Sequence, residues 1–236
     1  MKTLEDAIAL AEAMVAIGTE VGRETVALIT GMEQPLGRSV GNALEVREAI
    51  EVLQGQGSPR LLEVALTLGA QMMLLGRKAG NEAEARTRLS ELISSGAALA
   101  KLQELIVAQE GDPRVVSDLS LLPTAAHQVP VLADQDGYVA EIRAEEIGLA
   151  AMTIGAGRAT KESQIDLAVG LVLHKEVGDR VQAGESLADL YVNAKDTNAS
   201  AAAQNVKQAF ALVAKPVERP PLVYAIVSKT GVERLV

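Results

Sequence analysis

The chain changes its hydrophobic pattern once, and that change limits the folds it can adopt. Up to about residue 110 apolar residues recur at helical spacing, except for one apolar run at 25–30 (TVALIT) that predicts a buried strand. Between Gly111 and Pro130 the periodicity fails, and Pro113 and Pro123 interrupt the chain. Beyond Pro130 short strand-like runs follow one another. The pattern predicts an α/β part, a linker and an α+β part.

We therefore place a partial α/β domain at residues 1–115, a linker at 116–130 and an α+β domain at 131–236. In the last part the runs DGYVAEI, IDLAVGLVL, ESLADLYV and PLVYAIV predict strands, and helices are expected over 145–152 and 199–214. The expected fold class is an α/β fragment followed by an α+β domain with a mostly antiparallel, barrel-sandwich-like sheet.

The helix predicted after Asn42 has an unusual charge pattern. Asn42 and Glu45 have the spacing of a capping box, and Glu48 and Glu51 follow at intervals of three. Like charges at that spacing lie next to each other on a helix and repel. Either this is a solvated face, or one carboxylate meets a cation.

The inward faces of the first helices can also be predicted. Ala43, Val46 and Ile50 form an apolar stripe on the helix that follows Asn42. The next helix, over 61–75, is apolar nearly all round, which predicts that it is buried on every side.

The composition excludes several classes of function. Acidic residues outnumber basic ones by 31 to 22, the net charge is −9, and there are only three tyrosines, one phenylalanine and no tryptophan. A nucleic-acid site needs a basic patch or stacking aromatics, so no nucleic acid is expected as a partner. The absence of cysteine excludes disulfides and thiolate chemistry. With no bilayer-length apolar run or signal peptide, we expect a cytoplasmic protein with no membrane partner.

Few single residues point to chemistry. His127 and His174 have no partner at ligand or triad spacing, so structural roles are favoured. The glycine-rich segment GAGRATK contains Arg158 and Lys161, which with backbone amides could cradle an anion. The alternative is a helix C-cap at Gly155 and a simple turn, and this is the favoured interpretation.

The segment VGDRVQAGESLADLYV, at residues 177–192, resembles the hairpin half of biotinyl and lipoyl carrier domains. Those carriers expose a modified lysine on a tight turn. Lys195 follows the segment, but its neighbours NAKDT differ from the carrier turn. The resemblance supports the barrel-sandwich prediction more than a carrier function.

A longer resemblance covers essentially the whole chain. The segments MKTLEDA, GMEQPLGRSVGNALEVREAIE, DGYVAEIRAEEIGLAAMTIGAGRATKESQIDLAVGL and VGDRVQAGESL resemble, in order, the C-terminal part of pyrimidine-nucleoside phosphorylases, including thymidine phosphorylase. That family converts a pyrimidine nucleoside and phosphate to the free base and a pentose 1-phosphate. The resemblance implies that the first residues lie inside the family's α/β domain.

The resemblance also assigns sites. The family's phosphate- and base-binding segments precede the position equivalent to Met1, so no catalytic residue is expected in this chain. Members with a potassium site use two backbone carbonyls and one glutamate, which correspond here to Leu36, Ser39 and Glu48. Such oxygen ligands suit a hard cation. The other ligands would come from the upstream phosphate loop, so the potassium site is a partial one.

Three hypotheses follow. The first is a portion of a phosphorylase, a pentosyltransferase, that is inactive without the N-terminal half and associates with such a half or with itself. The second is a non-catalytic structural or binding remnant of a truncated gene. The third, least favoured, is a carrier modified at Lys195.

Overall fold

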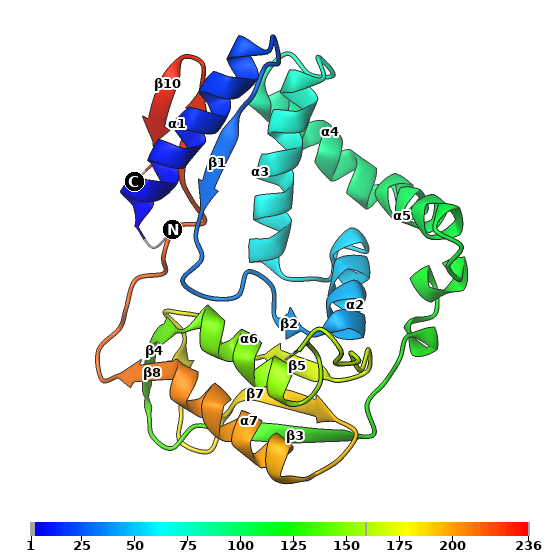
Figure 1. Cartoon of the computed structure of the whole chain (residues 1–236), viewed down its shortest axis with the longest axis vertical. Coiled ribbons are helices and arrows are strands. Elements are labelled where there is room, and N and C mark those ends of the chain that lie inside the picture. The colour runs from blue at the N-terminus through cyan, green and yellow to red at the C-terminus, as the bar shows by residue number, and fades with distance from the viewer. Residues whose placement is uncertain (1–2, 159, 236) are drawn as a thin grey trace. The chain divides into compact units, whose positions relative to one another are not determined.

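A computed structural model describes residues 3–158 and 160–235, which form two compact units (Figure 1). The first unit, unit 1, contains the described residues of 1–31, 59–94 and 220–236. The second, unit 2, contains the described residues of 32–58 and 95–219. Neither unit is continuous in sequence, whereas the predicted domains were. The predicted domain boundaries at residues 115 and 130 therefore stay a prediction.

Unit 1 joins the two ends of the described chain in one antiparallel sheet. Its strands lie in the order β1–β9–β10, with Ala27 opposite Val227. Helix α1 packs on this sheet through Ala11 and Val15, which form a small buried cluster with Val227. The elements are α1 (Leu4–Glu20), β1 (Ala27–Thr30), α3 (Pro59–Leu75), α4 (Glu82–Ser94), β9 (Val223–Ser228) and β10 (Gly231–Arg234).

Unit 2 contains two antiparallel sheets, with strand orders β2–β5–β7–β3 and β6–β4–β8. The helices of this unit are α2 (Asn42–Leu53), α5 (Ala97–Ala108), α6 (Ala144–Thr153) and α7 (Thr197–Ala209), with 3₁₀ turns η1 (Pro113–Val116) and η2 (Leu119–Leu121). The strands are β2 (Ser39–Val40), β3 (His127–Leu132), β4 (Gly137–Ile142), β5 (Gly170–Leu173), β6 (Arg180–Val181), β7 (Ser186–Val192) and β8 (Phe210–Val213).

One hydrophobic core holds unit 2 together. Strands β4, β5 and β7 supply fully buried residues such as Val139, Leu171 and Leu190. Helices α6 and α7 pack against each other and contribute Ile147 and Val206 to the same cluster. Both sheets and both helices therefore share one apolar interior.

The strand pairing confirms a mixed α/β architecture with antiparallel sheets. Among the described residues the two sheets of unit 2 do not close into a barrel through strand pairing. Strands β6 and β7 follow each other across a tight turn at Gly184 but belong to different sheets, so they form no paired hairpin. The barrel-sandwich-like arrangement thus stays a prediction.

Two details differ from the sequence predictions. The run PLVYAIV forms β9 and pairs with β1 in unit 1, although it follows the α+β strands in sequence. The helix predicted over 199–214 ends at Ala209, where Phe210 turns extended and pairs with Ile142 of β4. Long-range strand pairing, which local propensity does not encode, decides both outcomes.

Burial on two helices was also predicted incorrectly. Val46 of α2 is exposed, and the buried face includes Leu44 and Glu48 instead. Helix α3 buries Val64 but exposes Met72 to 72%, so it is not buried all round. Helix α3 has more apolar side chains than the described residues bury.

Candidate functional site

The loop before α2 is folded around one carboxylate. Glu48, on the second turn of α2, is 6% exposed. Its Oε1 accepts a hydrogen bond from the Arg38 amide at 2.8 Å, and its Oε2 accepts one from the Ser39 amide at 2.9 Å. A buried carboxylate needs such charge-assisted hydrogen bonds to offset its loss of hydration. Glu48 therefore fixes the course of the PLGRS segment.

Glycines allow this close approach. A Cβ atom on Gly37 would lie 2.5 Å from Glu48 Oε2 and 2.9 Å from its carboxyl carbon. Gly41 has a φ of 134°, and a Cβ atom there would lie 2.6 Å from the Val169 carbonyl oxygen. The loop is thus pressed against Glu48 on one side and against the chain leading into β5 on the other.

Each of the three glutamates of α2 has a different environment, so their carboxylates do not form one cluster of like charges. Glu45 Oε1 accepts a hydrogen bond from the Gly41 amide at 2.9 Å. The N-cap is Gly41 rather than the predicted Asn42, which is the first residue of the helix. Glu48 holds the loop, and Glu51 lines a cavity. The solvated-face interpretation is wrong for Glu48.

Of the three residues predicted to hold potassium, the structure connects two, since the Ser39 amide donates a hydrogen bond to Glu48. Leu36 precedes the closely packed Gly37 in sequence. Both hydrogen bonds to Glu48 come from main-chain amides, so the potassium site, which would need main-chain carbonyl oxygens as ligands, stays a prediction. In the described part of the chain, no three His, Cys, Asp or Glu side chains gather in a way that could hold a metal ion.

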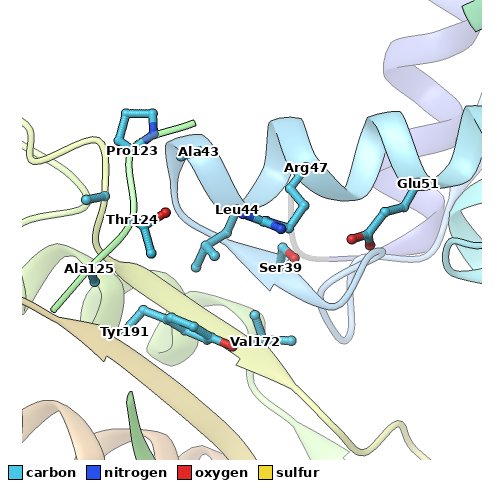
Figure 2. Close-up of a pocket in the computed structure, with 11 residues that line it drawn as sticks. Ser39, Ala43, Leu44, Arg47, Glu51, Pro123, Thr124, Ala125, Val172 and Tyr191 are labelled. Atoms are coloured by element: carbon cyan, nitrogen blue, oxygen red, sulfur yellow. The ribbon is translucent and has the colours of Figure 1, made fainter. Parts of the chain in front are cut away.

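Next to this loop lies a cavity of about 370 Å³ (Figure 2). Its polar lining comes from Ser39 on β2, Arg47 and Glu51 on α2, Thr124 in the loop before β3 and Tyr191 on β7. Its remaining lining residues are Ala43, Leu44, Pro123, Ala125, Ala168 and Val172. Burial and the charge of Asp189 raise the pKa of Tyr191, while the nearby Arg47 charge opposes that rise.

A polar cluster on the same sheet was missed by the sequence analysis. Asp189 of β7 is buried, and its Oδ2 lies 2.7 Å from His174 Nε2 and accepts a bond from Gln128 Nε2 at 2.6 Å. Ser186 Oγ lies 3.1 Å from its other oxygen. Burial opposes ionisation of Asp189, but these hydrogen bonds outweigh it and hold its pKa below the usual value.

This cluster joins strands β3 and β7 and the end of β5, so it ties the sheet together. That geometry agrees with a structural role for His174. The hydrophobic run around Asp189 (SLADLYV) was a signal that could have revealed it, because a lone carboxylate in a buried strand needs donors. His127 is exposed at the start of β3.

The remaining predicted positions lie on the surface. Helix α6 ends at Thr153 with Ile154 as its C-cap, one residue before the predicted cap Gly155, which follows with a φ of 99°. Arg158 and Lys161 beyond it are exposed. Neither lines the cavity in Figure 2. Residue 159 of the segment lies outside the described residues. Lys195 is exposed between β7 and α7, just before the helix cap Asp196, rather than in a hairpin turn.

No described helix combines the length and apolarity needed to cross a bilayer.

Two family models match the chain. Residues 1–99 match the glycosyl transferase family a/b domain, and residues 138–212 match the pyrimidine nucleoside phosphorylase C-terminal domain. The two matches together include the PLGRS loop, α2 and most of unit 2.

Individual curated relatives belong to the same family as the matched C-terminal domain model. The chain is 48% identical over 231 residues to a pyrimidine-nucleoside phosphorylase of Bacillus subtilis, a match that covers 97% of this chain and 52% of the relative. It is 53% identical over 198 residues to a pyrimidine-nucleoside phosphorylase of Staphylococcus aureus, covering 84% of this chain and 46% of the relative. The chain thus spans about half the length of the curated relatives it matches.

Proposed function

Because the chain belongs to the pyrimidine-nucleoside phosphorylase family, we propose that it is the C-terminal portion of such an enzyme. The complete enzyme would use phosphate to cleave a pyrimidine nucleoside, giving the free base and a pentose 1-phosphate. Positioning and charge neutralisation would carry that reaction. In this proposal residues 1–236 alone are inactive, because the family's phosphate- and base-binding motifs have no counterpart in them.

One observation carries this proposal: nearly the whole chain aligns, at 48% identity, with about half of a relative that bears the enzyme's name. The chain would supply scaffold and the loop held by Glu48. A cytoplasmic location and the absence of a nucleic-acid partner belong to the same proposal, as does the barrel-sandwich-like fold of the last part.

The PLGRS loop would hold potassium through the carbonyls of Leu36 and Ser39 and the carboxylate of Glu48. Potassium, when bound, would supply positive charge to the phosphate site of the complete enzyme. The role of Glu48 in this proposal is to orient the loop, since its two hydrogen bonds to Arg38 and Ser39 set the path of the main chain. The exposed Arg158 and Lys161 stay candidates for a separate anion loop.

Helix α1 supports the proposal that this chain docks on another polypeptide. Its buried face packs on the sheet of unit 1, yet Leu10, Met14 and Ile17, spaced by four and three residues, are 46%, 56% and 63% exposed on a second face. Strand β1 is an edge strand of the described sheet. An apolar stripe beside a strand edge favours association. The proposed occupant is the polypeptide that corresponds to the other half of the relatives.

Complementation tests this function. We would express the chain with a polypeptide corresponding to the first half of the Bacillus subtilis relative and assay release of the base from uridine and thymidine. Restored phosphate-dependent cleavage would support a split enzyme. Stable co-purification without turnover would contradict the catalytic proposal and favour the structural remnant instead. The control is a double variant, Met14→Glu with Ile17→Glu, which should lose association.

The carrier hypothesis has a simple test of its own. A biotinyl or lipoyl group on Lys195 would increase the mass of the protein recovered from cells. We expect the unmodified mass of residues 1–236, because Lys195 lies before a helix cap instead of in a hairpin turn.

A further inference from the structure

The cavity beside α2 has the features of a small-molecule site that the proposed reaction does not use. Its volume of about 370 Å³ lies at the lower end of the range for ligand pockets, which are roughly 300–1,000 Å³. All its lining residues belong to unit 2. Apolar walls and a few convergent polar groups are the usual lining of such pockets.

Arg47 is the residue that defines the chemistry of this cavity. Its Nη2 donates one hydrogen bond, 3.3 Å long, to the Leu119 carbonyl. Among the residues that the structure describes, Arg47 forms no ion pair, although Glu51 lines the same cavity. A guanidinium has five N–H donors in a planar fork, so most of its donors are left for a ligand.

Hydroxyl groups accompany this cation. Ser39, Thr124 and Tyr191 line the cavity from three different segments, and Figure 2 shows their side chains together with that of Arg47 around one space. The Arg47 charge acts on Tyr191, in agreement with their proximity. A guanidinium with nearby hydroxyls suits an oxyanion, because each oxygen can accept a charge-assisted or neutral hydrogen bond.

The apolar part of the lining indicates what else the ligand carries. Leu44, Ala125 and Val172 form walls beside the polar groups, and the volume far exceeds that of a bare inorganic anion. We propose that this cavity binds a small organic oxyanion, with its carboxylate or phosphate head on Arg47 and an apolar body against Leu44 and Val172. The proposal does not require phosphorolysis by this chain, although Ser39 belongs both to the cavity lining and to the PLGRS loop.

The test uses four small probes and the chain as it is. Benzoate and phenyl phosphate carry the two head groups on one body, benzamide is the neutral counterpart of benzoate, and inorganic phosphate lacks the body. Backbone amide chemical shifts of ¹⁵N-labelled protein would be followed during each titration. We expect benzoate or phenyl phosphate to shift the amides of Ser39, Thr124 and Tyr191 and to bind about tenfold or more tightly than benzamide. Which of the two binds better identifies the head group.

Two variants locate the binding. Arg47→Gln should remove the preference for benzoate over benzamide, and Ala125→Leu, which adds volume to the wall without changing charge, should weaken every probe. The matched control is Arg114→Gln, an exposed arginine paired with Asp112, which should change neither result.

Three outcomes would overturn the proposal. These are equal binding of benzoate and benzamide, shifts that lie outside the cavity, and no binding of either organic anion up to about 10 mM. Binding of inorganic phosphate alone would also contradict it, since the apolar body would then contribute nothing. If Arg47→Gln fails to fold, the comparison of benzoate with benzamide in wild type and Ala125→Leu still decides.

Discussion

The two units of this chain bury their apolar residues to very different extents. Unit 2 has one large core to which both sheets and helices α6 and α7 contribute. Unit 1 has a small buried cluster of Ala11, Val15 and Val227, while α1 leaves a second apolar stripe exposed. Unit 2 therefore buries a large apolar core, whereas α1 of unit 1 keeps an exposed apolar stripe that the proposed partner would cover.

The largest effect should come from matched truncations of helix isoleucines in the two units. Ile147→Ala in α6 removes a fully buried side chain from the large core and should cost about 2–5 kcal/mol of unfolding free energy. Ile8→Ala in α1 should cost less, because Ile8, although buried, lies outside the large core of unit 2. Urea denaturation of both variants measures the difference. Equal losses would contradict the contrast between the units.

The next effect concerns the loop held by Glu48. Glu48→Gln keeps the size of the side chain but replaces one acceptor oxygen with a donor, so one of the Arg38 and Ser39 amides loses its partner. We expect a loss of about 1–3 kcal/mol in thermal or urea unfolding. Glu45→Gln is the control: Glu45 accepts a single bond through Oε1, which an amide oxygen can replace. A similar loss in both variants would show that the loop does not depend on Glu48.

Asp189 predicts a pH dependence of stability in unit 2. Its pKa in the folded state lies below the ordinary value of an aspartate, so the folded protein binds the proton less tightly than the unfolded chain. The resulting stabilisation is fully present above the ordinary aspartate pKa and is lost as the pH falls through the lower folded value. Asp189→Asn should therefore flatten the acid side of the stability curve, measured by urea unfolding at several pH values.

The smallest effect on stability is expected on the exposed stripe of α1. Met14→Glu and Ile17→Glu replace side chains already more than half exposed, so each should change the unfolding free energy by no more than about 0.5 kcal/mol. The same variants should abolish docking of the complementary polypeptide, as measured by co-purification. A large loss of stability would mean that the stripe is packed within this chain rather than available to a partner.

Local sequence patterns predicted much of this fold. Thr3 with Asp6 and Asn81 with Glu84 have the spacing of helix-capping pairs in the sequence, and their hydrogen bonds of 3.1 and 2.9 Å stand at the starts of α1 and α4. The runs TVALIT, DGYVAEI and ESLADLYV contain β1, β4 and β7. These signals are local, since each depends on residues only a few positions apart.

The features that could not be predicted depend on distant residues. The pairing of β9 with β1 joins segments almost 200 residues apart, and no local pattern specifies it. The family resemblance selected Glu48, but its burial depends on Gly37 leaving room for the carboxylate. The Asp189 cluster and the Arg47 cavity likewise draw side chains from three or more segments.

The most direct measurement is a phosphorolysis assay of the purified chain alone. With uridine or thymidine and excess phosphate, the account predicts no release of uracil or thymine above a protein-free control, since the proposed role of residues 1–236 is to supply the scaffold and the loop held by Glu48 rather than the groups that bind the reactants. Phosphate-dependent release of either base by the lone chain, in proportion to its concentration, would contradict this account.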